Sequence, residues 1–157
     1  MLAAGLVVAL GGCGFHLEGA ARLPTAFRTT SIRAADRYTA FHEALVAALG
    51  VAGATVVGAG ESPRAVVEIL ADEPTQRVLS VSASNTPTEY EVYYAIRYRV
   101  LVDGQEMIAP SRLELTRSYS FDPRALLAKE REQEIIKAAL AHELASLVMH
   151  RIAALGS

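Results

Sequence analysis

Two histidines and a glutamate near the C-terminus come closest to a catalytic arrangement. His142 and Glu143 form the H-E pair that opens the zinc-protease motif H-E-x-x-H, in which both imidazoles share one face of a helix. The next histidine, His150, follows eight positions after His142, so the second ligand is missing from that face. We therefore interpret His142 as a solvated helix residue rather than a metal ligand.

Other groups of reactive residues do not complete a site either. Gly58-Ala59-Gly60 lacks the third glycine and the strand-to-helix setting of a dinucleotide-binding loop. The sequence contains no G-x-S-x-G nucleophile motif. Alternating acids in the last helical segment do not converge on one point and fit a solvated helix start: Glu130, Glu132 and Glu134. The sequence thus predicts a protein that is not an enzyme and that uses no metal or cofactor.

The single cysteine, Cys13, predicts a different kind of chemistry. One cysteine excludes an internal disulfide. Residues 2–12, LAAGLVVALGG, have the length of a signal-peptide core and are too short to span a bilayer. Residues 10–13, L-G-G-C, resemble the lipobox of bacterial lipoproteins, in which the cysteine is lipidated and becomes the new N-terminus. We expect residues 1–12 to be a signal peptide and Cys13 to carry the acyl chains, palmitate among them.

Two details refine this expectation. Only Met1 precedes the apolar run, without Lys or Arg, so we expect the natural start to lie upstream or to have been clipped. Gly14, rather than Asp, follows the cysteine, and by resemblance to lipoprotein sorting this indicates the outer membrane. The alternative interpretation of this region is a buried start of the first strand.

The composition indicates one globular domain over residues 13–157. The chain is 52% hydrophobic and 20% charged, which favours a packed core over disorder. The net charge of -2 at pH 7 provides no general attraction to nucleic acid. No second apolar run is long enough to span a membrane, so the lipid is the expected attachment.

The secondary structure expected along the chain follows the order β-α-β-β-β-α. The strands are expected at residues 29–35, 65–83, 90–102 and 105–121, and the helices at residues 38–50 and 125–154. Asp36 is the expected N-cap of the first helix, with Tyr38 on its apolar face. Pro74 predicts a bend or an edge position in the second strand. This order predicts an α+β fold with two helices on one face of a four-stranded mixed sheet.

The strand at residues 90–102, YEVYYAIRYRVLV, determines which face meets the helices. Its period of two separates Val92, Ile96 and Val100, expected against the helices, from Arg97 and Arg99 on the other face. Asp103-Gly104 predicts the hairpin turn that follows. The last helix is expected to pack through one stripe of apolar residues: Ile136, Leu140, Leu144, Leu147, Ile152 and Leu155. Its charged start, AKEREQE, is expected to reach beyond the sheet.

Three blocks of sequence resemble the LptE family of LPS-assembly lipoproteins. They are C-G-F-H-L-E-G from residue 13, T-E-Y-E-V from residue 88, and R-S-Y-S-F-D-P-R-A-L-L-A-K-E-R-E from residue 117. The blocks occur in the family's order and spacing and cover most of the chain. The family's fold of two helices on a four-stranded sheet agrees with the one expected from the periodicity.

The resemblance implies a lipid-anchored outer-membrane protein without enzymatic activity. It would sit as a plug in the lumen of the LptD β-barrel, in a one-to-one heterodimer that faces the periplasm, assist the barrel's assembly and contact lipopolysaccharide in transit. Lys129, the lysine of A-K-x-x-E, carries over as a lipopolysaccharide contact; a solvated lysine paired with Glu132 or Gln133 is the alternative. Residues 81–86 lack the family's second basic contact, so Arg77 is only a weak substitute.

Two other functional classes compete with this interpretation. A stand-alone lipid- or glycan-binding lipoprotein would need a concave apolar site that can bury acyl chains. We expect the two helices to fill their face of the sheet with core side chains and to leave little room for such a site. A periplasmic hydrolase is disfavoured because no catalytic set is found.

Overall fold

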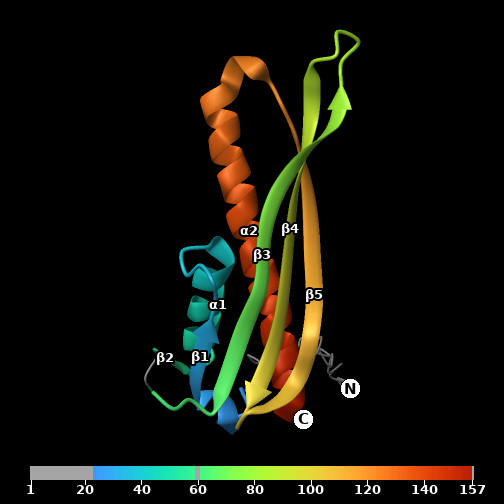
Figure 1. The fold of residues 1–157 in the computed structure, drawn as a ribbon. Helices are drawn as coiled ribbons and strands as arrows, with labels where there is room; N and C mark the ends of the chain where they lie inside the picture. The colour runs from blue at the N-terminus through green and yellow to red at the C-terminus, as the bar shows by residue number, and fades with distance from the viewer. Residues whose placement is uncertain (1–22, 59–60, 157) are drawn as a thin grey trace, which may run out of the picture.

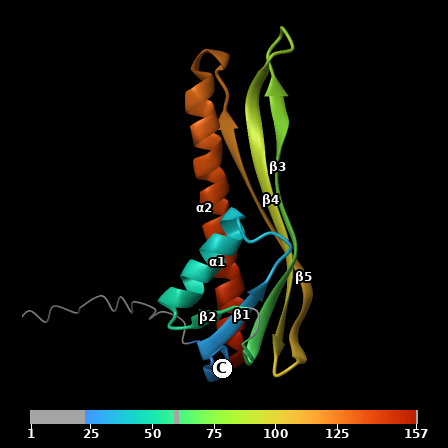
Figure 2. The ribbon, with the colours of Figure 1, turned by 60° about the vertical axis from the view of Figure 1, so that its left-hand side comes forward.

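The computed structural model describes residues 23–58 and 61–156. A long curved sheet forms one layer, and two helices of unequal length cover one of its faces (Figures 1 and 2). The elements are β1 (Thr29–Arg33), α1 (Ala40–Val51), β2 (Thr55–Val57), β3 (Ala65–Val81), β4 (Pro87–Val102), β5 (Gln105–Ser120) and α2 (Leu126–Ala153), with short 3-10 turns at Thr25–Arg28, Pro123–Ala125 and Ala154–Gly156. The α+β fold with two helices on one face of a mixed sheet is therefore confirmed.

The sheet has five strands in the order β2-β1-β3-β4-β5, one more than the sequence predicts. The additional strand, β2, has three residues and pairs parallel with β1. It is too short to show an alternation of its own. β1 also pairs parallel with β3, as expected for the first crossover, but only along residues 65–68 of β3.

The two long hairpins β3–β4 and β4–β5 form most of the sheet. Asp103 and Gly104 adopt positive φ values of 51° and 81° in the turn between β4 and β5, as the Asp-Gly pair predicts. β3 continues through Pro74. In the described part of the chain no second strand pairs with β3 beyond residue 68, so the proline lies at an edge, where a missing N–H is tolerated.

The face of β4 that meets the helices is the predicted one. Val92, Ile96 and Val100 are fully buried, and Arg97 is exposed on the opposite face. Tyr94 and Tyr98 lie between them on the helix side and are also buried. We call this face the inner face of the sheet and the opposite one the outer face.

Three details of the helices differ from the expectation. The N-cap of α1 is Thr39, whose hydroxyl accepts a hydrogen bond from the N–H of His42, and not Asp36. Tyr38 precedes the helix and is 90% exposed, because Asp36 instead accepts from the N–H of Tyr38 in a local turn. On α2, Leu147 is partly exposed while Val148 is buried, since the stripe from residue 136 advances by four residues each turn.

Candidate functional site

Lys129 lies at the start of α2, on the side that faces the sheet. Its ammonium is 6.0 Å from the centre of the Tyr119 ring and 2.7 Å from a carboxylate oxygen of Glu132. Its side chain is only 17% exposed. At Lys129 the charged start of α2 therefore packs beside β5, and the expectation that this start reaches beyond the sheet is wrong for this residue. The pairing with Glu132, which was the alternative to a lipopolysaccharide contact, is present.

An aromatic cluster on the inner face supports this lysine. The rings of Tyr90 and Tyr119 stack at 6.0 Å, and Phe121 meets Tyr90 edge-on at 5.0 Å. The side-chain amide of Gln76 donates to the Tyr119 hydroxyl at 3.1 Å. Burial is the main reason that the pKa of Tyr119 is raised. The ring face thus offers Lys129 a cation–π contact, and the ammonium keeps N–H donors for an anionic group.

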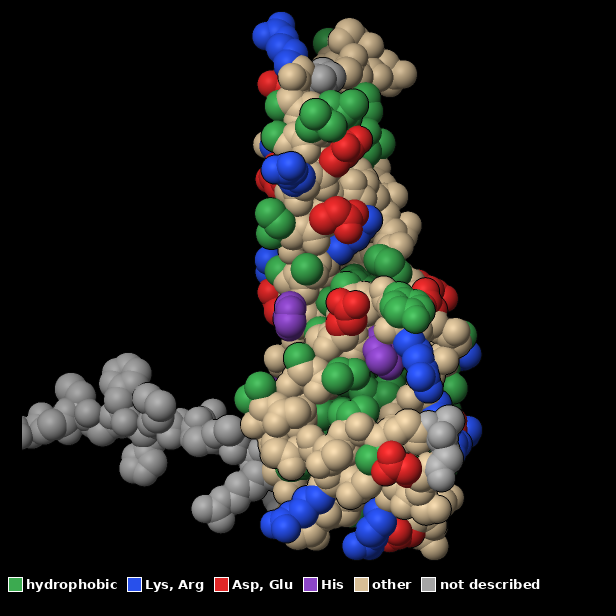
Figure 3. Space-filling view, turned by 90° about the vertical axis from the view of Figure 1, so that its left-hand side faces the viewer, with side chains coloured by type: hydrophobic (Ala, Val, Ile, Leu, Met, Phe, Trp, Pro, Cys, Tyr) green, Lys and Arg blue, Asp and Glu red, His purple; other side chains and the backbone are tan. Residues whose placement is uncertain are grey.

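Exposed apolar side chains surround the same end of the molecule. The tip of the β3–β4 hairpin and the start of α2 both lie at this end of the molecule (Figures 1 and 2). Space-filling shows hydrophobic side chains on this narrow upper half, with acidic and basic ones between them (Figure 3). The large ones at this end are Val78, Leu79, Val81, Leu126 and Leu127, the last 77% exposed. We call Lys129 and these five residues the amphipathic end; its apolar part was missed by the sequence reasoning, although V-L-x-V precedes the predicted turn.

Arg77, the second predicted basic contact, lies on the other side of the sheet. Its guanidinium donates to Glu91 at 2.6 Å, and both residues belong to the outer face because Gln76 and Tyr90 beside them face inward. The structure therefore does not bring Arg77 and Lys129 together. An anionic group that contacted one would be separated from the other by the sheet.

The outer face is polar and carries a network of ion pairs. Glu68 accepts from Arg99 at 2.6 Å and from Arg33 at 3.1 Å, and hydrogen bonding from Arg99 is the main reason that its pKa is lowered. Further along, Arg112 pairs with Glu114 at 3.2 Å and donates to the Tyr93 hydroxyl at 2.7 Å. Such a face is suited to aqueous surroundings rather than to burial in a core.

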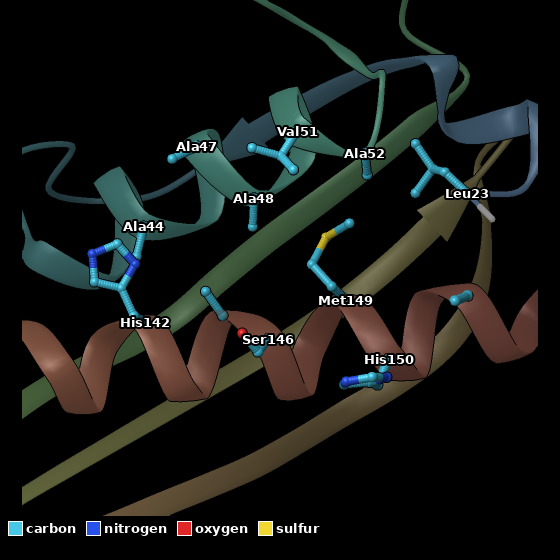
Figure 4. Close-up of a pocket in the computed structure, with 12 residues that line it drawn as sticks. Leu23, Ala44, Ala47, Ala48, Val51, Ala52, His142, Ser146, Met149 and His150 are labelled. Atoms are coloured by element: carbon cyan, nitrogen blue, oxygen red, sulfur yellow. The ribbon is translucent and has the colours of Figure 1, made fainter. Parts of the chain in front are cut away.

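An apolar groove of about 450 Å³ runs between α1 and α2 on the side away from the sheet (Figure 4). Met149 points across it from α2 toward α1, and Leu23 lies at the end where both helices finish. Its lining consists of Leu23, Ala44, Ala47, Ala48, Val51, Ala52, His142, Ala145, Ser146, Met149, His150 and Ala153. The core fills the space between helices and sheet as expected, but the expectation of little room for an apolar site overlooked this groove.

His142 and His150 are exposed on α2 and border the groove. Within residues 23–58 and 61–156 no three His, Cys, Asp or Glu side chains lie close enough to hold a metal ion. No helix in this part of the chain is both long and apolar enough to cross a membrane. Cys13 lies outside the described residues.

Comparisons with known proteins agree on one family. The profile of the family described as "LptE: Lipopolysaccharide-assembly" matches residues 27–152. The LPS-assembly lipoprotein LptE of Pectobacterium atrosepticum is 26% identical over 153 residues, which cover 96% of this chain and 83% of the relative. That of Yersinia enterocolitica is 25% identical over 157 residues, covering 97% and 74%.

Solved structures of two lipoproteins share the fold. Lipoprotein B of Nitrosomonas europaea superposes with a TM-score of 0.73 at 26% identity and covers 90% of this chain and 92% of its own. The rare lipoprotein B of Shewanella oneidensis gives a TM-score of 0.69 at 25% identity and covers 81% and 95%.

Proposed function

The chain belongs to the LptE lipopolysaccharide-assembly family, and on this premise we propose that it is an outer-membrane lipoprotein that forms a one-to-one, plug-like complex with the LptD β-barrel. In this role it assists assembly of the barrel and contacts lipopolysaccharide on its way to the cell surface. The lipid on Cys13 attaches it to the membrane, and the domain sits in the barrel lumen, facing the periplasm. The role is not catalytic.

The observation that carries the proposal is the amphipathic end. Lipopolysaccharide combines phosphate groups with acyl chains, so its contact surface needs a cation beside apolar side chains. Lys129 supplies the cation, held between Tyr119 and Glu132. Leu126, which precedes Lys129 by one helical turn and is exposed, supplies adjacent apolar surface, whereas Leu127 projects from the other side of α2 at the same end. Arg77 is a weaker candidate because it lies on the polar outer face, on the other side of the sheet from Lys129.

The polar outer face supports the placement in a barrel. A β-barrel with many strands encloses an aqueous lumen wide enough for a folded domain. A plug in such a lumen needs a surface that tolerates water and polar wall residues. The ion pairs of Glu68 with Arg99 and of Arg112 with Glu114 provide such a surface along the sheet.

Co-purification tests the partnership. Protein tagged at the C-terminus is extracted from outer membranes in mild detergent and captured. We expect a large heat-modifiable barrel protein in one-to-one amount. Capture of the lipoprotein alone, from membranes in which the barrel is present and extracted, would reject the proposed complex.

The α1–α2 groove favours a second candidate function, that of a stand-alone lipid- or glycan-binding lipoprotein. A volume of about 450 Å³ lies within the range of small-molecule sites. This function requires that the groove be free to take an acyl chain from outside. The occupant of the groove therefore discriminates between the two candidates.

A further inference from the structure

We infer that the α1–α2 groove is a docking site for the protein's own N-terminal arm, residues 15–22. The inference goes beyond the proposed function, and requires neither a barrel partner nor lipopolysaccharide. It rests on where the described chain begins, on the pattern of side chains that precede this point, and on the dimensions of the groove.

The described chain begins inside the groove. Leu23 is part of the groove's lining and also packs against the hydrophobic core (Figure 4). The next residue, Pro24, packs against the 3-10 turn that follows α2: a Cβ on Gly156 would lie only 2.9 Å from the Pro24 ring. Phe27 follows and is buried. The chain is therefore held in place at one end of the groove, directly after the arm.

The arm's sequence alternates in phase with Leu23. In an extended chain, side chains at every second position share one face. The face that includes Leu23 is apolar or glycine throughout: Phe15, Leu17, Gly19 and Ala21. The other face carries all three polar side chains of the arm, His16, Glu18 and Arg22, together with Ala20. An extended arm would thus continue the surface that Leu23 already presents to the groove.

The length of the arm matches that of the groove. The part of α2 that lines the groove, His142 to Ala153, rises about 17 Å at 1.5 Å per residue. An extended chain from Leu23 back to Leu17 covers about 20 Å at 3.3 Å per residue. Leu17 would then lie near the end of the groove bordered by Ala44 and His142, with Phe15 just beyond it.

Docking would also cover apolar surface that is otherwise open to water. Val51 on α1 is 86% exposed, although it lines the groove, and Met149 is only partly buried. If Cys13 carries the lipid, as proposed above, a docked arm holds the anchor near the start of α1. The domain would then be held at a defined orientation to the membrane rather than at the end of a free tether.

The mature chain from Cys13 offers two methionines as reporters. Met149 lies in the groove and Met107 lies on β5, where it is exposed. With ¹³C-labelled methionine methyl groups and a soluble paramagnetic agent, the relaxation of each methyl group measures its access to solvent. We expect Met149 to be protected in the unmodified mature chain. The double variant F15S/L17S should raise its relaxation several-fold and leave Met107 unchanged.

A matched variant and a fold measurement complete the test. H16S/E18S alters the same arm on its other face and should leave Met149 protected, and thermal unfolding should remain cooperative in both variants. Equal relaxation of Met149 in all three proteins overturns the inference. Protection that persists in F15S/L17S but is lost on dilution assigns the groove to a second copy; protection lost only on delipidation assigns it to a bound lipid. Either of these also overturns the inference.

A nitroxide on Cys13 tests the direction of the arm without changing its residues. In the mature chain prepared without the lipid, the thiol of Cys13 is free, and since Cys13 is the only cysteine, labelling is specific. We expect broadening of signals from Ala44 and His142 and none from Gly156 at the opposite end of α2. Uniform weak broadening over the whole surface would contradict docking.

Discussion

The hydroxyl of Tyr94 accepts a hydrogen bond from the backbone N–H of Phe41 at 3.2 Å, which joins the central strand β4 to the start of α1. The first N–H groups of a helix have no partner within the helix. Thr39 serves one of them, and the sheet serves a second through Tyr94. The pKa of Tyr94 is raised mainly by burial and further by the neighbouring carboxylate of Asp72, which keeps the phenol neutral.

The first prediction concerns this contact. Tyr94→Phe leaves the buried N–H of Phe41 without its acceptor and should lower the free energy of unfolding by about 1–3 kcal/mol. Tyr93→Phe is the matched control, because its hydroxyl bonds to Glu114 on the outer face in solvent. Denaturant unfolding of both variants measures the difference. Equal effects would show that the Tyr94 contact does not stabilise the start of α1.

The second prediction concerns the inner face of β4. Ile96→Asp would place an unpaired carboxylate in the core, where Ile96 is fully buried, and should cost about 3 kcal/mol or more. Arg97→Asp changes the adjacent exposed residue and should have a much smaller effect. Thermal unfolding followed by circular dichroism distinguishes the two. An unchanged midpoint for Ile96→Asp is incompatible with the packing described above.

How far the sequence predicts the fold depends on the length of each pattern. The alternation in residues 90–102 identified both the strand and its inner face, because a single period persisted over the whole segment. β2 was missed because its three residues have no period and are stabilised by pairing with β1. Asp36 and Thr39 are both suitable N-cap residues by type. Thr39 is the N-cap because α1 starts at Ala40, and the start of the helix depends on how the chain packs on the sheet.

The candidate site was less predictable than the fold. The resemblance to the LptE family identified Lys129 as a candidate. Its contact with Tyr119 could not be predicted, because it depends on how α2 lies along β5. Arg77 is separated from it because strand alternation sets Arg77 on the outer face. The α1–α2 groove depends on the spacing of two helices that are remote in sequence, and no local pattern encodes that spacing.

The third prediction concerns pH. Hydrogen bonding from Arg99 lowers the pKa of Glu68 below its ordinary value of 4.5, so its ionised form stabilises the fold above this pH. That stabilisation is lost as the pH falls through the lower folded pKa. Glu68→Gln should reduce the acid-induced loss of stability by about 1 kcal/mol at most, since the pair is partly exposed. The pKa values of Asp103 and Glu114 are also lowered, so these two residues should still cause some loss of stability in acid when Glu68 is replaced.

Unfolding free energies of the wild type and Glu68→Gln, measured from neutral pH down to below 4.5, test this effect. A variant with the same pH dependence as the wild type would show that the ion pairs of Glu68 contribute nothing to acid sensitivity.

The fourth prediction concerns the anchor. Cys13→Ala removes the proposed lipidation site, so the protein should leave the membrane pellet unless the barrel retains it. Fractionation in cells depleted of the barrel separates these two means of retention. An intact mass that includes residues 1–12 and an unmodified Cys13 would contradict the proposed processing.

The most direct test of the central claim, that the amphipathic end contacts lipopolysaccharide, compares the chain's two lysines. Both Lys129 and Lys137 pair with a glutamate three residues away, at 2.7 Å and 2.8 Å, but only Lys129 belongs to the amphipathic end. The measurement is the affinity of purified lipopolysaccharide for the wild type, Lys129→Gln and Lys137→Gln, with circular dichroism melts alongside. Loss of one charge-assisted contact predicts roughly tenfold weaker binding for Lys129→Gln and unchanged binding for Lys137→Gln. Equal affinities of the two variants, with intact folds, would contradict the claim.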